Sequence, residues 1–205
     1  MADALTADLP KTVATRPGSI LLARHGEPDI ARDVMLNARG YEDYWGRYEE
    51  LGIRPGQTPP RELLEQAAKA DVIISSVRRR SIESTQALVG GREFARNPIF
   101  VEAPLPAPGF PGFLKMSPKV WGFTARFWWW FFNHHAGQET RAEAESRADQ
   151  AADLIVELAE QGQDVMVLAH GFFNFMIGRS LRKRGWRLTA NQGWKYWSTR
   201  RFERG

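Results

Sequence analysis

Short apolar runs, each followed by a polar or charged group, recur along this chain. Runs of about four to eight apolar residues without polar alternation are typical of strands that are buried on both faces. Such runs lie at 19–24, 71–76, 98–102 and 163–169. We therefore expect these segments to be strands in the interior of a parallel sheet.

Apolar residues at helical spacing separate these runs. The spacing predicts helices from about Thr58 to 68, through Ile82 to Val89, from Glu139 to about Gln161, and from 171 to the basic end at 182–185. Strands that alternate with helices predict a three-layer α/β/α sandwich around a mostly parallel sheet. Residues 195–199 alternate loosely and predict an edge strand, whereas 28–60 is expected to be irregular.

The length of 205 residues fits a single domain, which we expect over 19–205. Residues 1–18 are polar and contain Pro10 and Pro17, which predicts a flexible N-terminal arm. The segment 103–138 is rich in proline, glycine and aromatic residues, and we expect it to be a cap insertion within the domain.

Composition narrows the classes of function. The chain has no cysteine, which excludes disulfides and thiolate chemistry. Its net charge of +4 is mild and its basic residues are scattered, so a solvated surface is favoured over a nucleic-acid interface. No apolar stretch reaches the roughly 18 to 20 residues of a membrane-spanning helix, and 1–18 lacks the pattern of a signal peptide. We therefore expect a cytoplasmic protein that binds no nucleic acid.

The polar groups that follow the apolar runs are the candidate chemistry. The carboxyl ends of parallel strands meet at one edge of a sheet, so the groups that follow the strands should share a crevice there. Guanidinium groups match phosphate oxygens, and a neutral imidazole nitrogen can attack phosphorus. Gly26 and Gly171 leave backbone N–H groups that could face an anion. The candidate set is Arg24, His25, Gly26, one arginine of 78–80, Glu102, His170 and Gly171.

This set resembles the histidine phosphatase superfamily, the phosphoglycerate-mutase-like proteins, and specifically their smaller-domain branch 1. The Arg-His-Gly motif of that family matches 24–26, its serine-then-arginine motif matches Ser76 and Arg80, and its second His-Gly matches 170–171. Ser84-Thr85 stands where the family has Thr-Ala, and 137–140 matches its Gly-Glu-Ser/Thr helix opening loosely. The resemblance extends from about Ser19 to Thr199.

The resemblance implies a metal-independent phosphomonoester hydrolase without a cofactor, acting on a small phosphorylated substrate. It implies that His25 is the nucleophile that becomes phosphorylated, and that Arg24, Arg80 and His170 hold the phosphoryl oxygens. In this scheme His170 is cationic or donates hydrogen bonds. Glu102 would protonate the leaving oxygen and then activate the water that releases phosphate.

Alternatives remain at several positions. Arg78 and Arg79 compete with Arg80 for the phosphate-binding role, and Glu27 is an alternative acid. Residues 28–60 do not match the sequence pattern of the family, so the substrates of the family cannot be assigned to this chain. The longer mutase signature is missing, which favours hydrolysis over mutase-type phosphoryl transfer. The other class of function is a non-catalytic module that binds a phosphorylated ligand or a partner. The presence of all four central candidates, which are His25, Arg80, Glu102 and His170, favours an enzyme over such a module.

The aromatic run 127–132 is unusual for a soluble surface. A helix that is apolar on every side is buried or contacts something outside the monomer. Packing of a cap on its own domain is favoured, with a homodimer interface, a lipid surface and an apolar phosphorylated substrate as alternatives. As a hypothesis, Trp128, Trp129 and Trp130 form a wall that favours phosphates with an apolar or aromatic body. His134 and His135 are expected at the surface.

Overall fold

The central strand of the sheet is β1 (Ile20–Arg24), as the apolar pattern predicts. The computed structural model describes residues 16–205, so the arm expected over 1–18 lies outside it except for 16–18. Six strands lie in the order β3-β2-β4-β1-β6-β5. The others are β2 (Val72–Ser75), β3 (Ala95–Arg96), β4 (Val165–Ala169), β5 (Trp186–Asn191) and β6 (Thr199–Arg204). β1 pairs in parallel with β4, which pairs in parallel with β2, whereas β6 and β5 are antiparallel.

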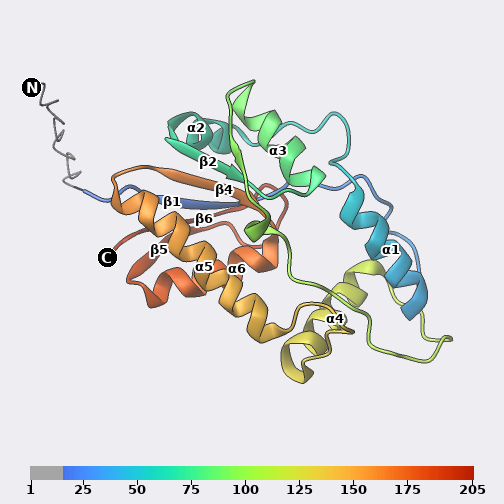
Figure 1. Cartoon of the computed structure of the whole chain (residues 1–205). Coiled ribbons are helices and arrows are strands. Elements are labelled where there is room, and N and C mark those ends of the chain that lie inside the picture. The colour runs from blue at the N-terminus through green and yellow to red at the C-terminus, as the bar shows by residue number, and fades with distance from the viewer. Residues whose placement is uncertain (1–15) are drawn as a thin grey trace, which may run out of the picture.

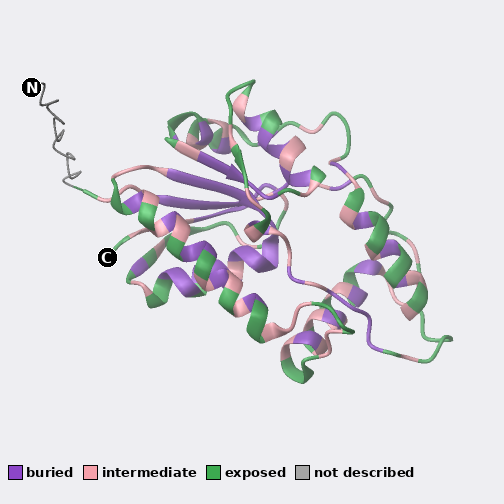
Figure 2. Ribbon diagram, viewed as in Figure 1, coloured by how far each residue is buried: buried purple, intermediate pink, exposed green. Residues whose placement is uncertain are grey.

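Helices cover both faces of this sheet (Figure 1). Ile20 and Leu22 point into one apolar cluster and Leu21 and Ala23 into the other, because successive strand residues alternate between faces. The first cluster includes α5 (Arg141–Glu160) and α6 (Gly171–Lys183), and the second includes α2 (Arg61–Lys69) and α3 (Arg79–Val89). β1 and β4 are accordingly buried along almost all of their length, whereas β3 and most of β5 are exposed (Figure 2). The expected α/β/α sandwich with a mostly parallel sheet is confirmed.

A cap lies beyond one end of the sheet, formed by α1 (Ala38–Glu50) and α4 (Pro118–Phe132) (Figure 1). The cap has an apolar cluster of its own, which includes Tyr41, Tyr44 and Trp121. An isolated bridge between Leu36 and Met116 joins the segment before α1 to the insertion 103–138. The expectation that 28–60 is irregular is therefore wrong over α1, which Asn37 caps by accepting a hydrogen bond from the Gly40 N–H.

The aromatic run is divided between the two sides of α4. Trp121, Ala125 and Trp129 lie four residues apart on the buried face. The Trp129 indole N–H donates to the Glu139 carbonyl at 3.0 Å. On the opposite side Phe123 is 75% exposed and Phe131 is 65% exposed. Packing on the same domain therefore accounts for the buried tryptophans and not for the outer phenylalanines.

Two predicted strands are wrong. Over 98–102 the chain instead forms a 3-10 turn, η1 (Pro98–Phe100), because Pro98 has no N–H to donate and Asn97 caps the turn through the Ile99 N–H. The short strand β3 precedes it. Residues 195–198 form a turn in which Trp197 has a φ of 63°, and the C-terminal strands lie on either side of that turn. None of the helices within 16–205 combines the length and hydropathy needed to cross a bilayer.

Candidate active site

His25 follows the last residue of β1 and is only 1% exposed. Its backbone N–H continues the pairing with β4 by donating to the Ala169 carbonyl at 3.1 Å. Its Nδ1 lies 2.7 Å from the Gly26 carbonyl oxygen. A carbonyl only accepts, so Nδ1 carries the proton and Nε2 retains a free lone pair. Burial, reinforced by the charges of Arg80 and Arg24, holds the pKa of His25 well below its ordinary value, so the ring is neutral.

His170 follows the last residue of β4 and is the N-cap residue of α6. Its ring packs edge-on against His25, with the centroids 5.2 Å apart. Nδ1 lies 3.3 Å from Nη2 of Arg80, which can only donate, and Nε2 lies 3.0 Å from the Ser76 hydroxyl. Nε2 therefore carries the proton. Burial and the Arg80 charge hold the pKa of His170 well below its ordinary value, so it donates as a neutral imidazole.

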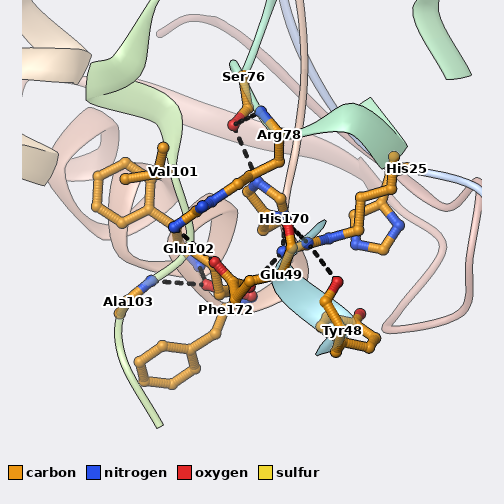
Figure 3. A network of polar contacts seen from close by, with 12 residues as sticks. His25, Tyr48, Glu49, Ser76, Arg78, Val101, Glu102, Ala103, His170 and Phe172 are labelled. Atoms are coloured by element: carbon orange, nitrogen blue, oxygen red, sulfur yellow. Dashed lines mark hydrogen bonds and ion pairs between the residues drawn. The ribbon is translucent and has the colours of Figure 1, made fainter. Parts of the chain in front are cut away.

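Arg80 is completely buried near the start of α3. Its Nη1 donates to the Tyr48 carbonyl at 3.0 Å, and its Nη2 donates to the Glu49 carboxylate at 2.7 Å. The other carboxylate oxygen of Glu49 lies 2.6 Å from Nη2 of Arg78. Glu49 thus bridges Arg78 and Arg80, the second of which contacts His170. Figure 3 shows the carboxylate in this network of polar contacts. The C-terminal turn of α1 covers the guanidinium that the sequence assigns to phosphate binding.

Arg24 lies at the end of β1, where Gly171 packs against its side chain. Its Nη1 donates to the Trp194 carbonyl, its guanidinium carbon lies 4.3 Å from the Tyr196 ring centroid, and its Nε has no partner. The Tyr196 ring also lies 5.7 Å from the His25 ring. Tyr196 therefore forms one wall beside both residues.

Glu102 lies at the N-terminus of α6. Its Oε1 accepts from the Phe173 N–H at 2.8 Å, and its Oε2 accepts from the Phe172 N–H at 3.3 Å. The segment that leads to Glu102 is held by Arg147 of α5, which donates to the Val101 carbonyl at 2.8 Å. The carboxylate is therefore fixed where the unpaired N–H groups of a helix stabilise negative charge.

The expectation that the Gly26 N–H faces an anion is wrong. This N–H donates to the Ser84 hydroxyl at 2.8 Å. A Cβ at Gly26 would lie 2.4 Å from the Trp197 ring, so the glycine is required by close packing against that indole. The N-terminal turn of α6 that begins at Gly171 is likewise occupied, because Glu102 accepts from its next two N–H groups.

A cavity of about 530 Å³ opens between the cap and the sheet. Arg24, Glu102 and Gly171 line it on the sheet side, whereas His25, Arg80 and His170 do not line it. Eight of its 17 lining residues are aromatic, and we call it the aromatic cavity. Its aromatic residues are Tyr41, Tyr44, Trp45, Tyr48, Phe123, Phe172, Trp194 and Tyr196. Trp128, Trp129 and Trp130 are absent from the lining, so the expected tryptophan wall is wrong.

The structure brings the main candidate residues together and separates two of their competitors, Arg79 and Glu27, whereas Arg78 shares Glu49 with Arg80. Arg79 pairs with Glu83 on the exposed side of α3. Glu27 pairs with Arg54 and does not line the aromatic cavity. Among residues 16–205, no three histidine or carboxylate side chains are grouped as metal ligands.

Three residues of the site, Glu49, Tyr196 and Arg126, do not stand out in the sequence. Glu49 could have been found from the spacing of Tyr41, Tyr44 and Tyr48, which marks the buried face of an amphipathic helix that ends beside it. Arg126 is visible as a cation within the aromatic segment, but nothing in its pattern shows that it faces a cavity. Tyr196 lies in the segment wrongly predicted to be a strand.

A scan against models of protein families found no match, and a search among curated protein sequences found none either. Solved structures do match. The native mycobacterial glucosyl-3-phosphoglycerate phosphatase is 16% identical, with a TM-score of 0.50 over 82% of this chain and 81% of that chain. Mycobacterial hydrolase 2 is 20% identical, with a TM-score of 0.51 over 82% of this chain and 73% of that chain. At such identities the likeness concerns the fold alone. This chain has the fold of these two structures, a phosphoglycerate-mutase-like α/β sandwich.

Proposed function

We propose that this protein is a metal-independent phosphomonoester hydrolase in which His25 becomes phosphorylated. The observation that carries the proposal is the tautomer of His25. The Gly26 carbonyl oxygen lies 2.7 Å from Nδ1 and accepts a hydrogen bond from it, so the proton stays on Nδ1. The Nε2 lone pair is therefore available to attack phosphorus. The lowered pKa keeps that lone pair free at neutral and mildly acidic pH.

Positive charge for the phosphoryl group comes from arginines in this proposal. Arg24 lines the aromatic cavity, and Arg80 contacts His170 beside the nucleophile. A carboxylate and a phosphoryl group both bind guanidinium through paired oxygens. Glu49 thus occupies on Arg80 the position that phosphoryl oxygens would take, and binding of substrate displaces its carboxylate.

The reaction then has two displacements. Nε2 of His25 forms a bond to phosphorus while the ester P–O bond breaks, and the leaving oxygen takes a proton from the Glu102 carboxyl. In the second displacement the Glu102 carboxylate takes a proton from water. The resulting hydroxide forms the new P–O bond, the P–N bond breaks, and inorganic phosphate leaves.

The substrate that fits best has an aromatic or apolar body. Arg24 and Glu102, which we assign to the phosphoryl site, line the aromatic cavity of about 530 Å³. Burying an apolar body there stabilises the complex by roughly 25 cal/mol per Å² of apolar surface. The aromatic residues of the cavity come from α1, the first half of α4, the start of α6 and the turn before β6.

The test is phosphohistidine formation on a panel of aryl and small polar phosphomonoesters, assayed with EDTA present. We expect turnover of aryl phosphates, acid-labile phosphate on His25, and loss of both in His25→Ala with an unchanged fold. Label on a serine or aspartate, or an active His25→Ala protein, would overturn the mechanism.

A specific observation favours a second candidate, a non-catalytic phospholigand-binding module. His25, Arg80 and His170 are all buried, and Glu49 covers Arg80. If wild type binds aryl phosphates or phosphonates in calorimetry but shows neither turnover nor label, this second candidate replaces the first.

A further inference from the structure

A guanidinium group on the cap lines the aromatic cavity without a protein partner. Arg126 lies on the same side of α4 as Lys119 and Gly122, which also line the cavity. Its guanidinium carbon lies 3.9 Å from the Phe172 ring centroid. Its Nε is buried without a hydrogen bond, and none of the hydrogen bonds or ion pairs within 16–205 involves its guanidinium.

Two other arginines that stack on an aromatic ring at the same distance are paired with carboxylates. Arg147 lies 3.9 Å from the Phe173 ring and makes hydrogen bonds through two nitrogens to the Glu139 carboxylate. Arg141 lies 3.9 Å from the Trp130 ring and donates to Glu145. These arginines join helices to their surroundings. Arg126 has the same stacked geometry but lacks the carboxylate, and it alone of the three lines the aromatic cavity.

The part of the cap that contains Arg126 offers no acidic residue to neutralise it. The segment 103–138 contains Lys115, Lys119 and Arg126 and no aspartate or glutamate. Burial lowers the pKa of Arg126, and the strongest opposing influence is the charge of Glu102. A desolvated cation without a partner costs free energy that a bound anion would recover.

We propose that Arg126 binds a second anionic group of the substrate from the cap side of the aromatic cavity. The substrate class is then a phosphomonoester whose aromatic or apolar body carries a further carboxylate or phosphate. This inference rests on the proposed function, because it defines the substrate of the same site. Lys119, which also lines the cavity, adds positive charge at this end.

The test compares two aryl phosphates that differ only in charge. 3-(4-Phosphonooxyphenyl)propanoate carries a carboxylate, and its amide does not. Two methylene groups insulate the ring, so both phenols leave equally well. We expect wild type to favour the acid in kcat/KM by about 10- to 100-fold, the range of a charge-assisted hydrogen bond.

Arg126→Met retains the stacking on Phe172 and removes the charge. We expect it to lose the preference by raising KM for the acid, with a much smaller change for the amide. Arg126→Lys should retain part of the preference, which separates loss of charge from loss of packing. Arg141→Met, which removes an equally stacked arginine outside the cavity, should keep the full preference. Equal losses on acid and amide in Arg126→Met, or no preference in wild type, would overturn the inference.

A binding measurement separates this inference from the proposed function. The non-hydrolysable phosphonomethyl analogues of the acid and the amide are titrated into the full chain by calorimetry. If wild type shows no turnover but binds the acid analogue at least 10-fold more tightly, and only through Arg126, the subsite stands and the hydrolase proposal fails. If aryl phosphates are hydrolysed but Arg126→Met binds both analogues as wild type does, the subsite fails and the hydrolase proposal stands.

Discussion

The carboxylate of Glu49 forms an ion pair with the fully buried guanidinium of Arg80, with Oε1 2.7 Å from Nη2. Its second oxygen pairs with Arg78 at 2.6 Å. The last turn of α1 adds the Tyr48 carbonyl to the same guanidinium. The cap thus supplies an internal anion to the arginine that we propose binds the phosphoryl group. Access to Arg80 therefore depends on movement at the end of α1.

Glu49→Gln should open this site. The neutral amide competes less well for Arg80, so we expect inorganic phosphate to bind roughly tenfold more tightly, equivalent to about 1.4 kcal/mol. Arg80 also loses its buried countercharge, so the free energy of unfolding should fall by about 1 to 3 kcal/mol. Calorimetry with phosphate and denaturant unfolding measure the two effects. Glu65→Gln, which removes an exposed ion pair with Arg61, is the control and should change neither. Weaker phosphate binding in Glu49→Gln would instead make Glu49 a residue that positions Arg80 for its ligand.

Glu102→Gln should slow the hydrolysis of esters with poor leaving groups by about 10² to 10⁴, the range of general acid catalysis. p-Nitrophenyl phosphate should lose less, because its phenolate leaves without a proton when formation of phosphohistidine limits the rate. Steady-state and single-turnover rates on alkyl and aryl phosphates provide the comparison. Glu27→Gln, at a carboxylate paired with Arg54 outside the cavity, should keep the wild-type rates. Equal losses on all esters would show that Glu102 acts by holding the N-terminus of α6.

Gly26→Ala should inactivate and destabilise the protein. Its Cβ would lie 2.4 Å from the Trp197 ring, and overpacking of this kind costs about 1 to 3 kcal/mol. Gly46→Ala is the matched control, since a Cβ at Gly46 meets nothing within 4 Å in α1. It should stabilise the helix by about 0.5 to 1 kcal/mol. Thermal unfolding and aryl phosphatase assays of both variants check this, and a stable, active Gly26→Ala protein would contradict it.

The free energy of unfolding should decrease as the pH is lowered below about 6.5, the ordinary pKa of histidine. Burial and the arginine charges lower the pKa of His25 and His170 in the native state. Between those lowered values and 6.5 the unfolded chain binds more protons, so the free energy of unfolding decreases as pH decreases. The slope should be shallower in His170→Asn, measured by denaturant unfolding from pH 7 to 5. If the slope of His170→Asn equals the slopes of wild type and of the surface control His135→Asn, His170 is not a source of the pH dependence.

The interior of the fold is predictable from the sequence because it consists of apolar residues. β1 and β4 are buried on both faces, and their uninterrupted runs end at His25 and His170. Helical register distinguishes Arg80, which points inward, from Arg79, which points to solvent. The apolar runs and the helical register are therefore sufficient to predict that the histidines and Arg80 lie together.

The cap and the C-terminal strands are not predictable on the same basis. Tyr41, Tyr44 and Tyr48 form the buried face of α1, and tyrosine does not stand out as an apolar stripe. β6 contains Arg200, which is buried through its stem and its contact with the Gly171 carbonyl. Because a charged residue occupies a buried position, β6 lacks the alternation of apolar and polar residues that would predict a strand. The partners of Glu49 and Arg126 depend on packing between distant segments, which local pattern does not encode.

The position of β1 has a consequence for synthesis of the chain. The strand is made first, yet one of its two neighbours, β6, begins at Thr199, roughly 175 residues later. At about 5 to 20 residues per second, a ribosome needs roughly 10 to 35 seconds to reach it. Throughout that interval Ile20, Leu21 and Leu22 present an unpaired apolar edge, the kind of surface that other nascent chains can join. Slow elongation through α5 and β4 would lengthen this exposure, and a chaperone bound near the N-terminus would shorten it.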